Sequence, residues 1–147
     1  MDFQYILDLL PYKRPFRFVD EISFIDENRI EGNYQYREDE FFYKGHFPEQ
    51  PITPGAILTE TMAQIGLVAF GIYLLLQNNP SIQIDKTRMP LLTSTNIHFY
   101  KKVLPEEKVM VTAEKIVFRH NKLRTRVSMK DLQNNIICDG DISGMFI

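Results

Sequence analysis

Residues 43–66, YKGHFPEQPITPGAILTETMAQIG, decide the fold because they join a proline-rich loop to the start of an apolar helix. Residues 56–76 are apolar almost all round, and a helix that is hydrophobic on every side is buried by other structure. Thr53, Pro54 and Gly55 predict where this helix begins, with Thr53 as N-cap and Pro54 in the first helical position. We therefore expect one long helix in the centre of the protein.

The remainder of the chain is rich in alternating, β-branched and aromatic residues. Residues 3–10 predict a short helix that Pro11 ends, and residues 16–38 predict a hairpin with its turn at 26–29. Four further strands are predicted over residues 91–103, 108–120, 122–133 and 135–147. Because a flat sheet would leave one side of the helix in water, the sheet must curl around it. The predicted fold class is α+β, an antiparallel sheet wrapped around a long central helix in a single domain, residues 1–147.

The composition is that of an ordinary globular protein, with 44% hydrophobic and 24% charged residues. Residues 65–76 are the longest apolar run, which is too short to cross a bilayer. The N-terminus has neither a basic region nor a small-residue cleavage site, and a lone cysteine agrees with a reducing compartment. We expect a cytoplasmic protein without a membrane or nucleic-acid partner.

Charge is unevenly distributed along the chain, although the formal net charge is only −2. Residues 86–130 carry eleven basic and three acidic side chains, whereas residues 1–85 carry six basic and thirteen acidic ones. This segregation either provides a surface that steers an acidic partner or only solvates the outer faces of strands. The sequence leaves both interpretations open.

His46 is the first candidate for chemistry. Prolines at positions 48, 51 and 54 restrict its loop, and rigid loops of this kind often carry function. Histidine is the side chain that titrates nearest neutrality, so it can act as a general base at physiological pH. The alternative is that His46 only satisfies hydrogen bonds within its own loop.

Glu60 is the second candidate, on the second turn of the predicted buried helix. Desolvation raises the pKa of a buried carboxyl group, which can then stay protonated and donate. A neutral base beside a proton-donating acid can remove one proton and deliver another. Gln64 lies one turn later on the same face and can orient the carboxyl group through a hydrogen bond. The alternative is an exposed helix start, where Glu60 would only complement the helix dipole.

The start of the helix supplies a third element. Its first N–H groups lack partners within the helix and can donate to an oxygen that develops negative charge, and Gly55 lets a substrate come close. The structural alternative is that Thr53 caps these donors. His98, His120 and Cys138 have no metal-ligand spacing, so we expect no metal and no cofactor.

Together these residues resemble the (3R)-3-hydroxyacyl-(acyl carrier protein) dehydratases of the FabZ type, which have the hotdog fold. The pattern G-H-F-P-x-x-P-x-x-P-G-x-x-x-x-E-x-x-A-Q is complete over residues 45–64. LPYKRPFRFVDEI at 10–22 resembles the family segment L-P-H-R-x-P-F-x-x-V-D, and FYKKVLPEEKV at 99–109 resembles F-R-R-P-V-x-P-G-D. The resemblance thus covers nearly the whole chain.

The resemblance implies loss of water from a 3-hydroxyacyl thioester to give the trans-2-enoyl thioester. His46 would take the α-proton, Glu60 would protonate the departing hydroxyl, and the N–H of Gly55 would hold the thioester carbonyl. Gln64 and Phe47 would complete the substrate-binding site. In the family the histidine and the acid of one site come from different subunits, which implies a homodimer or a trimer of dimers. FabA-like relatives have aspartate in place of Glu60.

Three departures from the family pattern are visible. Tyr12 replaces a histidine, Lys102 replaces a proline, and residues 105–107, PEE, replace P-G-D. We expect these positions to be scaffold and turn rather than part of the reaction centre. They suggest a divergent member that serves a specialised acyl chain, as in an aryl-polyene or lipid pathway.

The family's partner is an acidic acyl carrier protein that bears a phosphopantetheine-linked acyl chain. The resemblance gives the basic segment a use, because Lys101 and Lys102 would steer this carrier to the site. Two alternatives are a hotdog thioesterase, which hydrolyses the thioester, and a non-catalytic acyl-binding subunit paired with an active relative.

Overall fold

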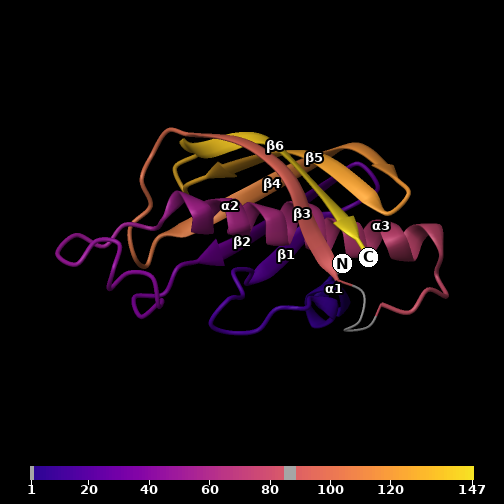
Figure 1. Ribbon diagram of the computed structural model, residues 1–147, viewed down its shortest axis with the longest axis horizontal. Coiled ribbons are helices and arrows are strands. Elements are labelled where there is room, and N and C mark those ends of the chain that lie inside the picture. The colour runs from indigo at the N-terminus through magenta and orange to yellow at the C-terminus, as the bar shows by residue number, and fades with distance from the viewer. Residues whose placement is uncertain (1, 85–88) are drawn as a thin grey trace.

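The computed structural model describes residues 2–84 and 89–147 (Figure 1). In chain order its elements are α1 (Gln4–Leu9), β1 (Glu21–Ile25), β2 (Arg29–Gln35), α2 (Gly55–Ala63), η1 (Gln64–Ala69), α3 (Phe70–Asn78), β3 (Pro90–Phe99), β4 (Lys108–Arg119), β5 (Lys122–Lys130) and β6 (Ile136–Phe146). The strands form one antiparallel sheet in the order β1-β2-β4-β5-β6-β3. The predicted α+β architecture is confirmed.

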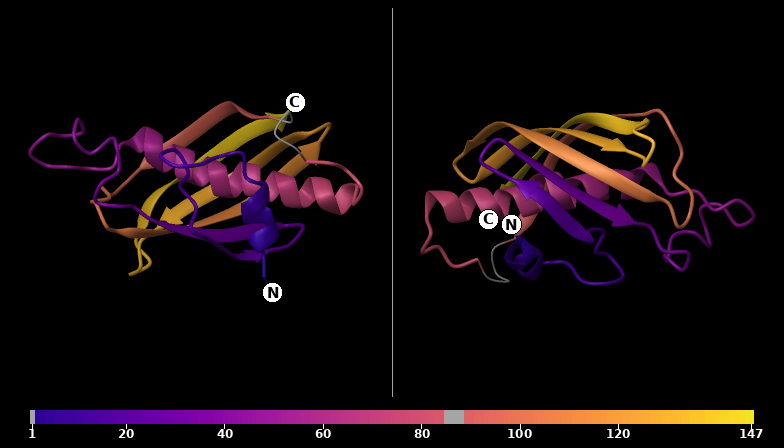
Figure 2. Two further views of the ribbon diagram at one scale, coloured as in Figure 1. Left: turned by 90° about the horizontal axis from the view of Figure 1, so that it is seen from below. Right: turned by 180° about the vertical axis from the view of Figure 1, so that it is seen from behind.

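The helix in the centre is continuous over 24 residues, Gly55–Asn78, and consists of α2, the π-helical segment η1 and α3. Figures 1 and 2 show the sheet curving over one side of this helix, with α1 on its other side. The helix is long and apolar enough to cross a membrane, so the sequence-based estimate from residues 65–76 alone was too short. In its apolar 18-residue stretch, 83% is buried inside the protein, as expected for a helix in the core of a wrapped sheet.

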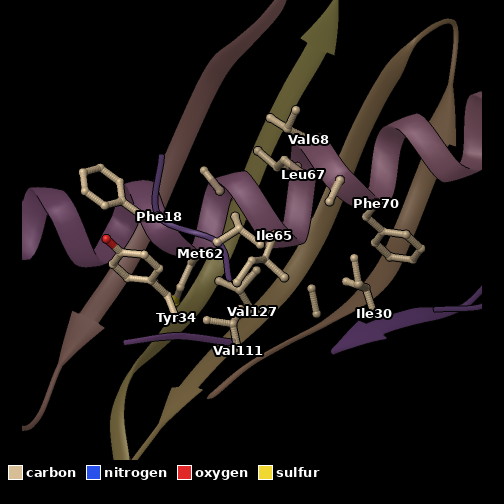
Figure 3. Close-up of a cluster of buried hydrophobic side chains, with 14 of the residues drawn as sticks. Phe18, Ile30, Tyr34, Met62, Ile65, Leu67, Val68, Phe70, Val111 and Val127 are labelled. Atoms are coloured by element: carbon tan, nitrogen blue, oxygen red, sulfur yellow. The ribbon is translucent and has the colours of Figure 1, made fainter. Parts of the chain in front are cut away.

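The middle of the helix packs directly on the concave face of the sheet (Figure 3). Ile65 and Phe70 are fully buried there, with Val127 of β5 near Ile65 and Ile30 of β2 near Phe70. A Cβ built on Gly66 would lie 2.9 Å from Val127 Cγ1 and 3.0 Å from Ala113 Cβ. Glycine at this position therefore lets the helix lie close against the sheet.

The helix begins one residue later than predicted, and its cap is different. Pro54 is the N-cap and Gly55 the first helical residue, with no side-chain cap hydrogen bond. Thr53 is buried, its hydroxyl is bonded to the Tyr43 hydroxyl at 2.7 Å, and its N–H donates to Val103 O at 2.8 Å. The predicted Thr53 cap is wrong because the hydroxyl and the N–H of Thr53 form hydrogen bonds with Tyr43 and Val103 instead.

Strand β3 is an edge of the sheet and is exposed along most of its length. Three of its apolar side chains are widely open to solvent, with exposed fractions of 42% for Leu91, 49% for Leu92 and 48% for Phe99. An apolar edge strand with unpaired backbone groups is a template for pairing with another strand.

Candidate active site

His46 is held in its loop by backbone and side-chain hydrogen bonds. Its N–H donates to Phe42 O at 3.1 Å, and its carbonyl oxygen accepts from the Ile52 N–H at 2.9 Å. Its Nδ1 lies 2.8 Å from Ile52 O. Because a carbonyl oxygen can only accept, Nδ1 carries the proton of the neutral ring and Nε2 keeps its lone pair. The loop therefore presents His46 in the tautomer that a general base needs.

The surroundings of His46 combine an aromatic ring with the start of the central helix. The half-exposed Phe47 ring stacks on the imidazole, with centroids 4.2 Å apart. His46 and Gly55 line the same open cavity, together with Phe99 and Tyr100 at the end of β3. The helix has no side-chain cap, so the Gly55 N–H is available to a ligand in this cavity. A Cβ at Gly55 would come within 3.2 Å of the Phe99 ring and crowd it.

Glu60 borders a second cavity, of about 230 Å³, which runs along the helix and is mostly apolar in its lining. The lining residues are Tyr12, Glu60, Ala63, Leu67, Val68, Pro90, Leu91, Leu92, Leu123, Gly144, Met145 and Phe146. Burial raises the pKa of Glu60 above its ordinary value of 4.5, and the hydrogen bond from Gln64 opposes this rise in part. Partial burial therefore favours the protonated carboxyl group, in the direction that the sequence predicts.

Gln64 is fully buried and fixes one side of the Glu60 carboxyl group. Its Nε2 donates to Glu60 Oε2 at 2.9 Å, which confirms the hydrogen bond predicted from their spacing. The same nitrogen donates to Phe16 O at 3.0 Å, and Oε1 accepts from the Phe18 N–H at 2.7 Å. These backbone partners determine which end of the amide faces Glu60.

Tyr12 belongs to the Glu60 cavity, which sequence reasoning did not foresee. Burial, with a smaller contribution from the negative charge of Glu60, raises the pKa of the Tyr12 phenol well above its ordinary range. Position 12 was expected to be scaffold outside the reaction centre, and the structure places its side chain in the lining of the cavity that Glu60 borders. The sequence did contain an indication of this position, because Tyr12 replaces a histidine of the family pattern, and both side chains are titratable.

Lys101 and Lys102 both border the His46 cavity, but only Lys101 has a strong partner. Its ammonium pairs with Asp131, whose carboxylate also accepts from the Gln133 and Asn135 N–H groups. The Lys101 ammonium and these backbone donors hold the pKa of Asp131 well below its usual range. Within residues 2–84 and 89–147, no carboxylate forms an ion pair with Lys102. Lys102 is thus the better placed of the two to meet an acidic partner.

Other candidate chemistry finds little support. Burial raises the pKa of the Cys138 thiol to about 12, and its sulfur lies 3.8 Å from Met62 Sδ in the core. In the part of the chain that the structure describes, no three His, Cys, Asp or Glu side chains gather as metal ligands would. His46 and Glu60 therefore remain the two candidates for proton transfer.

The two candidates border different cavities, and none of the residues that the structure describes lines both. His46 lies with the last residues of β3, whereas the Glu60 cavity includes the first residues of that strand. One chain therefore holds the two candidate residues in separate cavities, near opposite ends of an exposed edge strand.

Comparison with known proteins identifies the family of the chain. A family model described as a FabA-like domain matches residues 10–142. The 3-hydroxyacyl-(acyl-carrier-protein) dehydratase FabZ of Anoxybacillus flavithermus is 33% identical over 121 residues, which are 81% of this chain and 79% of that one. The FabZ of Caldicellulosiruptor bescii is 28% identical over 138 residues, 93% of this chain and 92% of its own.

A solved structure, the dehydratase heterocomplex ApeI:P from Xenorhabdus doucetiae, matches in fold with a TM-score of 0.78. At 9% identity it covers 95% of this chain and 89% of that chain. The protein has the hotdog fold, as the sequence resemblance implied. The chain belongs to the FabA-like family, in which its relatives include the FabZ dehydratases.

Proposed function

We propose that this chain is a hydro-lyase that dehydrates (3R)-3-hydroxyacyl-(acyl carrier protein) to the trans-2-enoyl product, in fatty-acid or related acyl-chain biosynthesis. Membership of the FabA-like family and the FabZ relatives support this activity. The observation that carries the assignment of roles is the hydrogen bond from His46 Nδ1 to Ile52 O, which leaves Nε2 as a base. The raised pKa of Glu60 supports its role as the acid.

The reaction needs one proton removed and one delivered. His46 Nε2 takes the proton from C2 of the acyl chain, and the electron pair of that C–H bond becomes the C2=C3 double bond. Glu60 gives its proton to the C3 hydroxyl, which leaves as water when the C3–O bond breaks. The Gly55 N–H donates to the thioester oxygen while negative charge develops there. Gln64 keeps the Glu60 carboxyl group in place, and no cofactor is required.

A two-fold dimer would bring these groups together. When two copies of an antiparallel edge strand pair about a two-fold axis, the first residues of one lie beside the last residues of the other. Pairing of β3 would therefore set the Glu60 cavity, which includes Leu91 and Leu92, beside Phe99 and Tyr100 of the second copy. Glu60 would then face His46 of the partner subunit. The exposed apolar side chains of β3 support this mode of association.

The proposal also covers the location of the enzyme, its oligomeric state and its acyl carrier. We place the enzyme in the cytoplasm as a single domain, residues 1–147, in a homodimer or a trimer of dimers. Lys102 borders the His46 cavity and would attract the acidic carrier to its mouth. The departures at Tyr12 and Lys102 favour a specialised acyl chain over the bulk saturated ones.

The direct test offers (3R)-3-hydroxyacyl-carrier substrates and follows the formation of the conjugated enoyl thioester and of free thiol together. Enoyl formation without thiol release is expected. Thiol release instead would make the protein a thioesterase, and neither product would indicate an acyl-binding subunit. Each of the substitutions His46→Ala and Glu60→Gln should lower kcat about 10²–10⁴-fold in a folded protein.

A further inference from the structure

The Phe146 ring lines the Glu60 cavity and packs against Gly71 of the central helix. Glu60, Ala63 and Leu67 line the cavity in order along the helix, and Phe146 lines it from the last strand. Gly71, one turn after Leu67, carries no side chain, and a Cβ built there would overlap the Phe146 ring. The ring thus occupies the place that a larger residue at position 71 would fill.

Strand β6 and the helix give the order of the lining. A Cβ on Gly144 would lie 3.1 Å from Leu67 Cδ1, so Gly144 sits beside Leu67. Two residues further along β6, Phe146 sits on Gly71. The cavity therefore extends from Glu60 away from the helix start, toward Gly71, which lies eleven positions later in the helix.

The ring is anchored rather than loose. Phe146 is only 6% exposed, and its N–H donates to Asn121 O at 2.9 Å. It is also paired with Pro90 of β3 in the sheet. Its backbone is thus held from two sides, and a ligand could pass the ring only by displacing a buried aromatic side chain. Such displacement is unfavourable in a closely packed interior.

We propose that Phe146, seated on Gly71, sets the upper limit of acyl-chain length that this enzyme accepts. The inference rests on the proposed function, since the C3 hydroxyl must lie at Glu60 for the chain to run toward Phe146. A chain that ends before the ring buries all of its methylene groups in the cavity. A longer chain must displace the ring or leave methylene groups in water, and either lowers kcat/KM.

The test measures kcat/KM for 3-hydroxyacyl pantetheine thioesters of graded chain length. The wild-type profile is expected to fall sharply beyond one length. In Phe146→Ala the fall should move to longer chains, with the longest substrates gaining at least about tenfold relative to the shortest. Phe146→Leu keeps a buried apolar side chain and should shift the chain-length limit less. It allows the limit to be measured if the alanine variant is poorly folded.

Phe3→Ala is the matched control, because Phe3 is 7% exposed and does not line the cavity. It should lower stability without changing the chain-length profile. Profiles of Phe146→Ala and Phe146→Leu that run parallel to the wild type would overturn the inference while leaving the proposed function intact. Absence of enoyl product from the wild type at every length would instead refute the proposed function.

Discussion

Gln64 donates its side-chain N–H to Glu60 Oε2 at 2.9 Å across one turn of the buried helix. The amide cannot turn its oxygen toward the carboxyl group, because that oxygen already accepts from the Phe18 N–H. One carboxyl oxygen of Glu60 is therefore always an acceptor, and the other remains for a substrate hydroxyl. The loop at Phe16 and Phe18 thus positions the proposed acid through Gln64.

Replacing Gln64 should change the pH dependence of the reaction as well as the stability. The Gln64 hydrogen bond lowers the pKa of Glu60, so Gln64→Met should raise that pKa further. The alkaline limb of the kcat/KM profile, where Glu60 loses its proton, then moves to higher pH. Stability should fall by about 1–3 kcal/mol, because the buried Phe18 N–H loses its partner. A lower rate with an unmoved alkaline limb would mean that Gln64 acts only on the fold.

Glu60→Gln should alter stability in a pH-dependent way. Because burial raises the pKa of Glu60 in the folded state, the folded protein binds more protons than the unfolded chain above the ordinary pKa of 4.5. Stability of the wild type therefore falls as pH rises from 4.5 through the raised pKa. The neutral glutamine lacks this loss, so the variant should gain in Tm relative to the wild type from acid to neutral pH. Parallel Tm curves would speak against a raised pKa.

Glu106 occupies the position of the glycine in the family segment P-G-D, and its φ of 72° lies in the left-handed region. A residue with a Cβ is strained there, so Glu106→Gly should stabilise the protein by about 1 kcal/mol, measured by chemical denaturation. The neighbouring Glu107 is the control. Its carboxylate accepts from the Leu104 N–H at 3.0 Å, so Glu107→Gly should destabilise instead. Equal effects of the two substitutions would contradict the strain at Glu106.

Charge reversal at the two lysines of the His46 cavity should have different effects, on KM for Lys102 and on Tm for Lys101. Lys102→Glu is expected to raise KM several-fold for carrier-bound substrate and to leave KM for a pantetheine thioester unchanged. Lys101→Glu breaks the contact with the buried Asp131 and should lower Tm. If Lys102→Glu affects both substrates equally, the charge does not act through the carrier.

Much of the fold could be predicted from the sequence because its determinants are local. The apolar helix, the alternating strands and the spacing from His46 to Gln64 are patterns within short segments, and the described structure contains each of them. The strand ends were less predictable. Residues 100–103 were predicted as strand but follow the end of β3 at Phe99, and the Thr53 N–H donates to Val103 O there.

What the sequence could not give are the contacts between distant segments. Tyr12 enters the Glu60 cavity from 48 residues away, and Lys101 meets Asp131 across 30 residues. No local sequence pattern predicts such pairs. The relation of His46 to Glu60 is harder still, because a single chain keeps them in separate cavities.

The most direct test of a dehydratase site shared between two subunits is complementation. His46→Ala and Glu60→Gln chains are co-expressed, and enoyl formation by the mixed dimers is compared with that of each variant alone. Random pairing should restore roughly a quarter of wild-type activity, because half of the dimers are mixed and each of these has one intact site. A chain that carries both substitutions, co-expressed with wild type, should gain no activity from its mixed dimers. Mixed dimers no more active than the two parent variants would contradict the shared site.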